Sequence, residues 1–582
     1  MTPSAALAQV VLDELMRLGV RDVVLAPGSR SAPFAYALHA ADAAGSLRLH
    51  VRVDERSAAF LALGIAKATG VPAPIITTSG TAVVNLYPAV LEAHESGVPM
   101  LLLTADRPPE LRGTRANQTT DQLGLFGSFA RWFHDLGVPE ARPAAQASWR
   151  TAMDRALAAA TGATGGDPGP VHINVPLRDP LAPQIGPTDT STPEWPESLD
   201  GRTDGSAWTH VARTGAAASY APSAPESLSS LPASVQLLLP QVDRTLVVLG
   251  DAPDSLLEAA IEWAARRGHP VIGEPFGRWH EGRLPHGVRV AERAGEPDLR
   301  PDRILAVGRI TLSRSLARLM RLPQVRVDLV TGDARWPDPG HVVHAVHGPE
   351  VLVEPSGGGG GVAAGDLHSE AGAFRSAWAD AAAKASAQIE GEMSWPSGVA
   401  LADAVTSALP AESLLFLGSS NGVRHVELVR GLRAAEGGDR AQVVASRGLA
   451  GIDGCVSTAA GLALGSGRPT YAFLGDLTFL HDSNGLLIGP DEPRVDLTIV
   501  VGNDDGGAIF SDLEYGQADR RQAYPGVLER VFRTPTGTDL AALCAAHGVR
   551  HVLASTPEAV HEAVSATPNG ITVVEVPLTH RD

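Results

Sequence analysis

The stretch PTYAFLGD, residues 469–476, decides the fold because it ends an apolar strand in a glycine and an aspartate. A second stretch, DLTIVVGNDDGG at 496–507, repeats the pattern, and its Asp504 comes 28 residues after Asp476. In open parallel sheets, ligands bind beyond the carboxyl ends of the strands, which is where both polar ends fall. The pair therefore predicts a parallel α/β sheet with a ligand site along one edge.

These two strand ends carry oxygen atoms suited to a divalent cation. The carboxylates of Asp476 and Asp504 and a backbone carbonyl near Gly506 would supply three hard oxygen ligands, the kind that Mg²⁺ takes. The neighbouring glycines let the backbone approach phosphate groups closely. Asn503 is a weaker candidate for the side-chain contact. Either strand end alone is ordinary turn chemistry, so the metal prediction depends on the pair at this spacing.

The N-terminal part of the chain alternates β-branched runs with alanine-rich helical patterns, which is typical of a parallel α/β domain. Two further α/β units follow, with no obvious direct sequence repeat among the three. The expected strands of the first unit lie in DVVLAPG (22–28), LRLHVRV (47–53), PAPIITTSG (72–80), PMLLLTADRP (99–108) and GPVHINVPL (169–177). Those of the other two lie in RTLVVLGDAP (244–253), HPVIGEP (269–275), RILAVGR (303–309), SLLFLGS (413–419), AQVVASRG (441–448), the two stretches already quoted and ITVVEVP (571–577).

Two breaks in composition separate these units. Pro, Ser, Thr and Gly are dense after about residue 183, and the five glycines Gly357–Gly361 cannot hold a regular element. We therefore expect α/β domains and connecting segments with the following boundaries: a domain at 1–182, a connector at 183–240, a central domain at 241–355, a linker with a helical lead-in at 356–397 and a last domain at 398–582.

Composition excludes several classes of partner. With 582 residues the chain exceeds the size of a single hydrophobic core, about 250–300 residues. Its net charge of −18 disfavours nucleic acid or an anionic membrane surface as a partner. The amphipathic N-terminus and the absence of a run of about 20 apolar residues indicate neither a signal peptide nor a membrane span. Cys455 and Cys544 form no metal-site spacing, so we expect a cytoplasmic protein.

The pair of strand ends resembles the metal and diphosphate motif of thiamine-diphosphate enzymes, which is usually GDG followed by NN. Here Leu477 replaces the third-position glycine and Asp504 the second asparagine, and aspartate is also a hard oxygen ligand. The resemblance implies three doubly wound domains, namely pyrimidine-binding, central and diphosphate-binding, with Mg²⁺ or Mn²⁺ held at Asp476, Asp504 and Gly506. In this superfamily the two cofactor-binding domains of one site come from different subunits. A homodimer, or a dimer of dimers, is therefore implied.

Glu55 lies where the strand LRLHVRV gives way to a helix. A lone glutamate at such a place is more often a partner of the helix dipole. The resemblance gives it a catalytic role, because thiamine enzymes place a carboxyl group against the aminopyrimidine ring of the cofactor. That contact drives the imino tautomer, whose nitrogen removes the C2 proton of the thiazolium. A buried glutamate with a raised pKa would suit this task.

Three further stretches look closely like the 2-succinyl-5-enolpyruvyl-6-hydroxy-3-cyclohexene-1-carboxylate synthase family of menaquinone biosynthesis. They are LAPGSRSAPFAYAL (25–38), LLLTADRPPELRGTRANQTTDQ (101–122) and SRGLAGIDGCVSTAAGLALG (446–465). The similarity covers nearly the whole chain and is weakest at 183–240 and in the central domain. It implies decarboxylation of 2-oxoglutarate and 1,4-addition of the resulting succinyl carbanion equivalent to isochorismate. Both substrates are dicarboxylates, so the pocket needs several guanidinium groups.

Matching motif to motif, this resemblance assigns individual positions. The cofactor contacts fall on Glu55, Gly475, Asp476, Leu477, Asp504, Gly506 and Ile509, with Ile452 as the bulky apolar residue that bends the cofactor. The substrate contacts fall on Ser29, Arg30, Arg107, Asn117, Gln118, Ser420, Arg424, Arg447 and Phe510. In the central domain the family has a lysine followed by an arginine where this chain has Ser313-Arg314. Arg314 is therefore the candidate to take over that carboxylate contact.

Three alternatives remain open from sequence. Another thiamine-diphosphate 2-oxo acid decarboxylase or carboligase, acetolactate-synthase-like or oxalyl-CoA-decarboxylase-like, would have a nucleotide-binding central domain. No glycine-rich phosphate loop follows RTLVVLG beyond GDAPDS. A non-catalytic binding protein on the same fold would have a broken proton relay or metal site, yet Glu55, Asp476 and Asp504 are present. A dinucleotide-binding protein would need GxGxxG after the first strand, and LAPGSRS lacks it.

Overall fold

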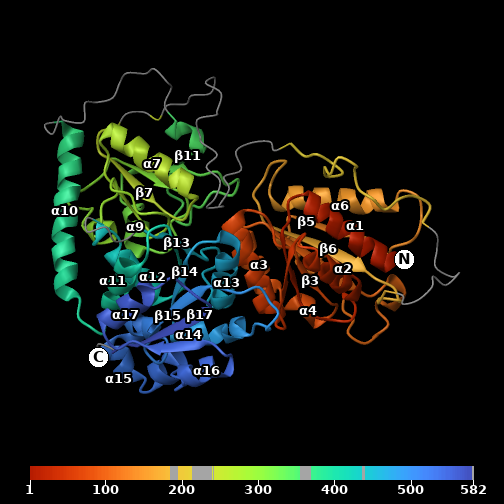
Figure 1. Ribbon diagram of the computed structural model, residues 1–582. Coiled ribbons are helices and arrows are strands. Elements are labelled where there is room, and N and C mark those ends of the chain that lie inside the picture. Colours follow the sequence, from red (N-terminus) through yellow and green to blue (C-terminus); the bar gives the residue numbers. More distant parts are fainter. Residues whose placement is uncertain (184–194, 213–238, 240–241, 354–368, 435–439, 580–582) are drawn as a thin grey trace. The chain divides into compact units, whose positions relative to one another are not determined.

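A computed structural model describes residues 1–183, 195–212, 239, 242–353, 369–434 and 440–579. In them the chain forms three parallel β-sheets of six, five and six strands (Figure 1). The prediction of three parallel-sheet α/β domains is confirmed. The chain packs into two compact units, the first made of residues 1–217, 446–467 and 481–495 and the second of the remainder. The sequence-based domain boundaries stay predictions, and the Gly357–Gly361 linker lies outside the described residues.

The N-terminal sheet, in the first unit, has the strand order β2-β1-β3-β4-β6-β5. Its strands β4 and β6 are buried along their full length, as expected for a parallel sheet with helices on both faces. The strands are β1 (Asp22–Leu25), β2 (Arg48–Val51), β3 (Ile75–Thr77), β4 (Met100–Asp106), β5 (Trp132–Asp135) and β6 (Pro170–Pro176). The helices and 3₁₀ turns beside them are α1 (Pro3–Arg17), α2 (Ala32–Ala43), α3 (Glu55–Thr69), α4 (Thr81–Val84), α5 (Tyr87–Ser96), η1 (Pro109–Leu111), η2 (Gly127–Phe129) and α6 (Ala145–Ala160).

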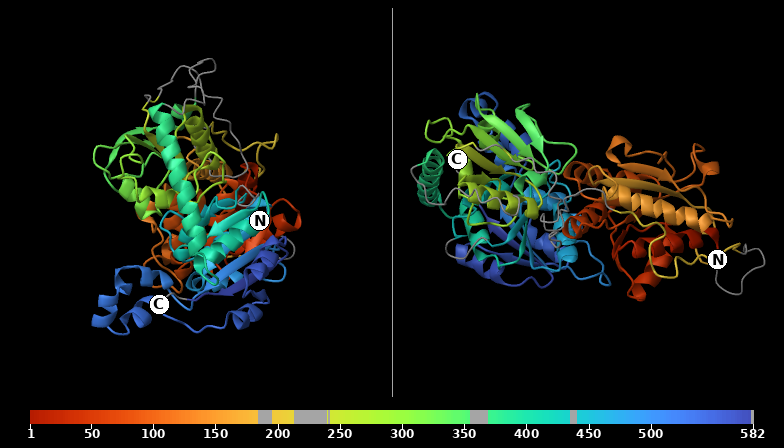
Figure 2. Two further views of the ribbon diagram at one scale, coloured as in Figure 1. Left: turned by 90° about the vertical axis from the view of Figure 1, so that its left-hand side faces the viewer. Right: turned by 90° about the horizontal axis from the view of Figure 1, so that it is seen from above.

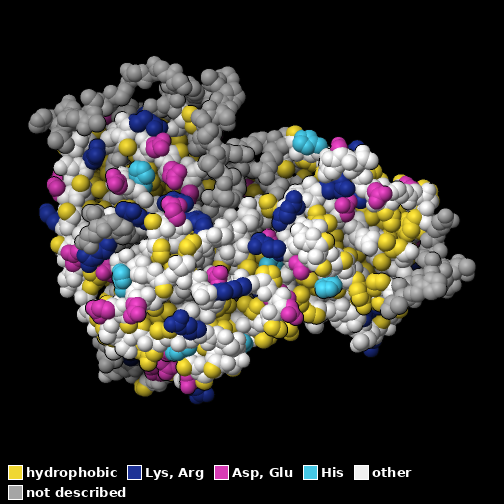
Figure 3. Space-filling model, in the orientation of Figure 1, with side chains coloured by type: hydrophobic (Ala, Val, Ile, Leu, Met, Phe, Trp, Pro, Cys, Tyr) yellow, Lys and Arg dark blue, Asp and Glu magenta, His cyan; other side chains and the backbone are white. Residues whose placement is uncertain are grey.

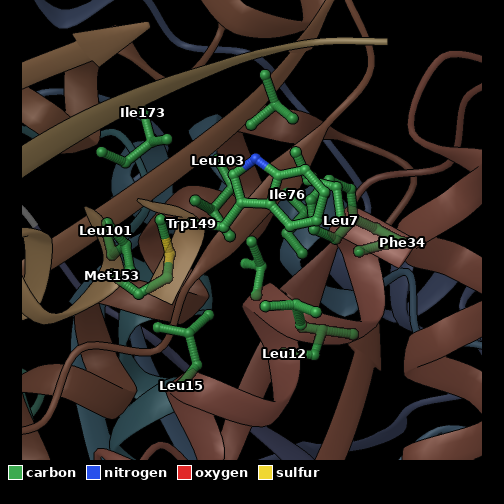
Figure 4. Close-up of a cluster of buried hydrophobic side chains, with 14 of the residues drawn as sticks. Leu7, Leu12, Leu15, Phe34, Ile76, Leu101, Leu103, Trp149, Met153 and Ile173 are labelled. Atoms are coloured by element: carbon green, nitrogen blue, oxygen red, sulfur yellow. The ribbon is translucent and has the colours of Figure 1, made fainter. Parts of the chain in front are cut away.

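One face of this sheet is covered by α1, α2 and α6, which form a closed apolar core with it. Figure 4 shows Leu7, Phe34 and Trp149 of these helices directed at Leu101 and Leu103 of β4, and all of them are at most 3% exposed. Helix α3 packs on β1, β3 and β4, and α5 on β6, without joining that core, so they cover the other face. Burying each such large apolar side chain stabilises the domain by about 1.5–3 kcal/mol.

Helix α13 (Cys455–Ser466) comes from the last third of the chain but packs along α3 in the same unit. The two helices touch through glycines. A Cβ atom on Gly64 would collide with the Thr458 carbonyl oxygen, and one on Gly461 with the Leu61 carbonyl oxygen. Only glycine allows two helix backbones to approach so closely. The short 3₁₀ turn η6 (Ser483–Leu486) belongs to the same unit.

The central sheet, in the second unit, has the order β11-β10-β9-β7-β8. Helices α7 and α10 cover its two faces (Figure 2). Trp263 of α7 belongs to the core on one face, and Phe374 and Trp378 of α10 belong to the core on the other. The strands are β7 (Thr245–Leu249), β8 (Val271–Gly273), β9 (Arg303–Val307), β10 (Arg326–Val330) and β11 (Val343–His347). The helices are α7 (Asp254–Arg267), α8 (Gly287–Ala291), α9 (Arg314–Leu319), η4 (Pro349–Leu352) and α10 (Glu370–Glu392).

The C-terminal sheet, also in the second unit, has the order β13-β12-β14-β15-β17-β16. Counted from its own first strand this is 2-1-3-4-6-5, the order of the N-terminal sheet. The strands are β12 (Leu414–Leu417), β13 (Gln442–Ala445), β14 (Thr470–Gly475), β15 (Leu497–Asn503), β16 (Arg550–Leu553) and β17 (Ile571–Pro577). The helical elements are α11 (Gly398–Ala408), α12 (Asn421–Val429), α14 (Asp476–His481), η7 (Ala508–Asp512), η8 (Glu514–Gly516), α15 (Ala518–Ala523), the π-helix η9 (Leu528–Arg533), α16 (Leu540–Ala546) and α17 (Pro557–Ser565).

The surface and the cysteines agree with the composition. On the face drawn in Figure 3, acidic and basic side chains are interspersed over both units. Cys455 and Cys544 are buried free thiols. None of the helices in the described ranges combines the length and apolar character that a membrane span needs.

Candidate functional site

The N-terminal sheet reverses its strand order at β1, which pairs with β2 on one side and β3 on the other. Ligands bind at such switch points. The loops that leave β1 and β3 meet there, because the Arg30 backbone N–H donates to the Thr78 hydroxyl at 3.3 Å. Gly28 lies so close to the Thr78 side chain that a Cβ atom would not fit. Exposed Ser29 and buried Arg30 therefore stand at the carboxyl edge of this sheet.

Two arginine side chains converge beside these loops. Arg30 is 8% exposed, donates to the Leu177 carbonyl at 3.0 Å and pairs with Asp179 at 3.3 Å. Its buried Nε–H finds no hydrogen-bond partner in the described structure. Burial and the nearby positive charge of Arg30 lower the pKa of Arg107. A buried guanidinium whose charge is disfavoured by a second guanidinium nearby makes a site that an anion would stabilise.

Arg107 and Gln118 both bond to the loop after β3, and Asn117 bonds to Arg107. The Arg107 guanidinium donates to the Ser79 hydroxyl at 2.5 Å and to the Asn117 carbonyl at 3.0 Å. The Gln118 side-chain amide donates to the Ser79 carbonyl at 3.1 Å, and the Ser79 hydroxyl also lies 2.9 Å from the Gln118 carbonyl. The structure thus brings Ser29, Arg30, Arg107, Asn117 and Gln118 to one edge.

Behind this edge lies a buried polar network that the sequence analysis missed. Gln122, fully buried, accepts the Gly80 backbone N–H at 3.1 Å and donates to the Asn174 side chain at 3.1 Å. Asn174 donates to Asp106 at 3.0 Å, and Asp106 accepts the Arg107 backbone N–H at 2.7 Å. The network fixes the backbone on which Arg107 stands. The asparagine inside the apolar run GPVHINVPL was the available signal.

Glu55 is the first residue of α3 and is half-buried, less enclosed than the sequence analysis expected. The preceding Asp54 caps the helix, since its carboxylate accepts the backbone N–H groups of Arg56 and Ser57 at 2.9 and 3.3 Å. Across the described residues, the Glu55 carboxylate forms no hydrogen bond or ion pair. It is therefore available to a bound molecule.

Arg447 and Ile452 lie on the segment that leads into α13, in the same unit as Glu55. Arg447 is 6% exposed, and Ile452 is half-buried. Glu92 of α5 fixes this segment, because its buried carboxylate accepts the backbone N–H groups of Gly448 at 2.8 Å and Leu449 at 2.7 Å. The sequence analysis did not single out Glu92. A glutamate on the alanine-rich face of YPAVLEAHES was the only hint.

The C-terminal sheet has the equivalent switch point, because β12 pairs with β13 on one side and β14 on the other. Ser420 follows β12 with a left-handed φ of 86°. Its carbonyl accepts a hydrogen bond of 2.6 Å from the exposed guanidinium of Arg424. On the next strand, β14 ends at Gly475 and α14 begins at Asp476. Ser420 and Gly475-Asp476 therefore share this edge.

Asp476 and Asp504 form a close carboxylate pair. Asp476 is 3% exposed and accepts the Gly506 backbone N–H at 2.7 Å. Burial and the neighbouring charge of Asp476 raise the pKa of Asp504 to about 7, and burial also raises the pKa of Asp476. Two carboxylates that resist carrying both charges suit a divalent cation, whose charge removes the repulsion. In the described part of the chain no third acidic, histidine or cysteine side chain completes a cluster, so backbone oxygen at Gly506 is the fitting third donor.

The other predicted residues of this edge have separate surroundings. The Asn503 amide donates to Glu575 at 2.7 Å, which engages it away from the carboxylate pair. Leu477, Ile509 and Phe510 are half-buried. A cleft of about 240 Å³ is lined by Asp504, by Ala508 of η7 and by Asn421 at the N-terminus of α12. Backbone N–H groups at a helix N-terminus favour phosphate.

Arg314 is not brought together with these candidates. It is exposed at the first position of α9, on the central sheet, and in the described ranges it makes no hydrogen bond to another predicted site residue. The loop that precedes Arg314 is nevertheless held in place by hydrogen bonds to one buried side chain. Fully buried Glu274 accepts the backbone N–H groups of Thr311, Leu312 and Ser313 at 2.6–3.1 Å.

Comparison with known proteins adds two findings. Residues 5–125 match the thiamine pyrophosphate enzyme family, in its N-terminal TPP binding domain. The 2-succinyl-5-enolpyruvyl-6-hydroxy-3-cyclohexene-1-carboxylate synthase of Saccharopolyspora erythraea is 46% identical, over 99% of this chain and 96% of its own length. The proteins of the same name from Nocardia farcinica and Rhodococcus erythropolis are each 43% identical over 99% of this chain, and over 96% and 97% of their own.

Proposed function

The chain belongs to the 2-succinyl-5-enolpyruvyl-6-hydroxy-3-cyclohexene-1-carboxylate synthase family of thiamine-diphosphate enzymes, and on that premise we propose its reaction and the residues that perform it. It decarboxylates 2-oxoglutarate and joins the remaining four-carbon unit to isochorismate by 1,4-addition, a step of menaquinone biosynthesis. The products are the family's named compound and CO₂. The proposal draws on identity over nearly the full length and on the polar edges of the two six-stranded sheets.

The convergence of Arg30 and Arg107 is the observation that supports dicarboxylate substrates. Each guanidinium can bind a carboxylate with two parallel hydrogen bonds, and the buried Nε–H of Arg30, which has no partner among the described residues, is one donor available for this. We assign Ser29, Asn117 and Gln118 to the same substrate surface. Arg447, Ser420, Arg424 and Phe510 complete the set of proposed substrate contacts, and Arg314 is retained as an accessory one.

Thiamine diphosphate, when bound, would supply a thiazolium carbon with a removable proton and a ring that can accept the electron pair left by loss of CO₂. Glu55 holds the aminopyrimidine end by hydrogen bonding and keeps a proton available there. Within the described ranges the Glu55 carboxylate has no hydrogen-bond or ion-pair partner, which fits that task. Gly454 lies against the Phe60 ring of α3. Ile452, two residues earlier in the chain, supplies apolar support for the cofactor near the same helix.

Mg²⁺, or Mn²⁺, fits the opposite end of the cofactor. Asp476 and Asp504 supply carboxylate oxygens, and Gly506 supplies a carbonyl oxygen. Gly475, Leu477 and Ile509 border the diphosphate, and the N-terminus of α12 offers N–H donors to it. The observed carboxylate pair, with the raised pKa of Asp504, is what supports a cation at this place.

A direct assay tests the reaction. We expect CO₂ release from 2-oxoglutarate with thiamine diphosphate and Mg²⁺, and formation of the adduct when isochorismate is added. Pyruvate should not replace 2-oxoglutarate, because it lacks the second carboxylate. Turnover of pyruvate in preference to 2-oxoglutarate would point to the acetolactate-synthase-like alternative.

The assembly and location belong to the same proposal. A homodimer, or a dimer of such dimers, would let cofactor-binding edges from two chains face each other, as family membership leads us to expect. Light scattering on the purified protein measures this, and a monomer at micromolar concentration would contradict it. We place the enzyme in the cytoplasm, where its two buried thiols stay reduced.

A further inference from the structure

A short segment from the last third of the chain, residues 481–492, bonds to residues on both sides of Glu55. The Arg56 guanidinium donates to the His481 carbonyl at 2.7 Å. The Ser57 hydroxyl donates to Asp482 at 3.1 Å, and the Asn484 side-chain amide donates to Asp54 at 2.8 Å. All of these residues belong to the first unit. Among the described residues, this segment thus bonds to Asp54, Arg56 and Ser57 but forms no hydrogen bond with the side chain of Glu55.

Asp482 is the centre of this contact. Its side chain is fully buried, and each of its two carboxylate oxygens accepts a hydrogen bond from a different helix. One bond comes from the Ser57 hydroxyl in the first turn of α3, and the other, 2.7 Å long, comes from the Ser457 backbone N–H in the first turn of α13. Asp482 therefore fixes the N-terminal ends of both helices to the same point.

Asn484 completes the contact through the helix cap. One oxygen of the Asp54 carboxylate accepts the backbone N–H groups of Arg56 and Ser57, and the other accepts the Asn484 amide. The cap is therefore held on both sides and cannot rotate without breaking one of these bonds. Further along the segment, Glu492 accepts the Val51 backbone N–H at 2.6 Å and pairs with Arg52 at 3.2 Å, which fixes the end of β2 before the cap.

We propose that Asp482, assisted by Asn484, is a positioning residue that sets the direction in which Glu55 meets the aminopyrimidine of the cofactor. This inference deepens the proposed function and rests on it, because it presupposes the proton-relay role of Glu55. A carboxylate that fixes both helix ends in a buried site holds the glutamate to within a fraction of an ångström. Loss of about 1 Å of alignment in a catalytic group costs about 100-fold in rate.

The decisive measurement is the rate of hydrogen–deuterium exchange at the thiazolium C2 of the bound cofactor, in the full-length holoenzyme. In Asp482→Asn the side-chain NH₂ would face the Ser457 or Ser57 donor, so one bond is lost while volume is kept. We expect exchange to slow about 10- to 100-fold, while the cofactor Kd from calorimetry changes less than about threefold. Ser57→Ala removes the bond from the α3 side and should slow exchange in the same direction.

A second measurement uses the protein without its cofactor. In the metal- and cofactor-free protein, backbone amide exchange in the first turn of α3, followed by mass spectrometry, should accelerate in Asp482→Asn. Asp491→Asn is the matched control, since Asp491 is exposed in the same segment. It should leave both kinds of exchange at the wild-type rate. Ser57→Ala keeps the test open if Asp482→Asn fails to fold.

A double-mutant cycle separates positioning from general stability. With Glu55→Gln already in place, adding Asp482→Asn should slow C2 exchange no further, because both changes act on one step. Additive slowing would overturn the inference, as would unchanged exchange in both Asp482→Asn and Ser57→Ala while Glu55→Gln remains slow. If Glu55→Gln itself exchanges at the wild-type rate, the proposed role of Glu55 fails instead.

Discussion

Aspartate at position 504, where the thiamine-enzyme motif usually has asparagine, changes the electrostatics of the diphosphate edge. Asp476 and Asp504 lie side by side and partly desolvated, and the pKa of Asp504 rises to about 7 from burial and from the charge of Asp476. At neutral pH the metal-free pair therefore shares a proton for about half of the time. Cation binding must displace that proton, so it becomes coupled to pH.

The metal-free protein should lose stability as pH rises through this range. Asp504 has a folded pKa of about 7 against an ordinary value of 3.8, so its contribution is fully present below pH 3.8. Between these values the folded state binds more protons than the unfolded state, and the unfolding free energy falls as pH increases to 7. Asp504→Asn should remove this slope and stabilise the metal-free protein at pH 8 by at least about 1 kcal/mol, since one pKa unit corresponds to about 1.4 kcal/mol.

Urea unfolding of the metal-free wild type and Asp504→Asn, at pH 5 and pH 8, measures the difference. Asp505→Asn is a poor control because the Asp505 carboxylate accepts hydrogen bonds from the backbone N–H groups of Thr536 and Gly537. Exposed Asp491→Asn is a suitable one. Parallel pH profiles for wild type and Asp504→Asn would contradict the carboxylate-pair account.

At the scale of single residues, the sequence predicted the residues that follow strands. It did not predict the buried side chains that hold those loops in place. Asp476 and Asp504 follow apolar strands directly, and Arg30 lies in the loop after another, so their place at a sheet edge could be predicted from the local pattern. Gln122, Glu92 and Asp482 hold backbone N–H groups or hydroxyls that are distant in sequence. Their partners are set by tertiary packing, and no local pattern encodes them.

Among the elements, the contact between α3 and α13 has the least room for change. Gly64 and Gly461 bring the two backbones together, and α3 begins at Glu55 while α13 begins just after Ile452. A single added methyl group must therefore push the helices apart. Such overpacking costs about 1–3 kcal/mol in a well-packed core, and it would also move the helix ends that carry both residues.

Gly461→Ala should consequently lower the melting temperature and slow turnover. Gly391→Ala is the matched control, because Gly391 lies in helix α10 with open space around its Cβ position. That change should be neutral or stabilising by about 0.5–1 kcal/mol, the ordinary advantage of alanine over glycine in a helix. Scanning calorimetry on both variants checks this. If Gly461→Ala lowered the melting temperature no more than Gly391→Ala does, the α3–α13 contact would tolerate the added methyl group.

The sequence predicted most of the strands, but it did not predict how α13 packs against α3. Every predicted strand quoted above overlaps an observed one, because buried parallel strands read as apolar runs. The packing of α13 against α3 could not be predicted, since alanine- and glycine-rich helices show little amphipathic contrast. The helix CVSTAAGLALGS (455–466) has small or apolar residues on every side, so its sequence does not reveal which neighbour it packs against.

For the whole molecule, cofactor and cation should act together as a stabilising ligand. A ligand present at 100 times its Kd that binds only the folded state stabilises that state by about 2.7 kcal/mol. We expect thiamine diphosphate with Mg²⁺ to raise the melting temperature, and thiamine diphosphate with a chelator to raise it much less. Asp476→Ala should lose the metal-dependent part of the shift. A full shift in that variant would remove Asp476 from the metal site.

The identical strand order of the two six-stranded sheets, 2-1-3-4-6-5, has an evolutionary consequence. Topology persists long after sequence similarity has decayed, because reordering strands requires refolding the whole domain. This shared order is what duplication of one ancestral gene segment would leave behind. In this chain the carboxyl edge of one sheet carries Arg30 and Arg107, and that of the other carries Asp476 and Asp504. Exchanging the arginines of one edge for the aspartates of the other would therefore exchange the charges of the two edges while leaving the strand order unchanged.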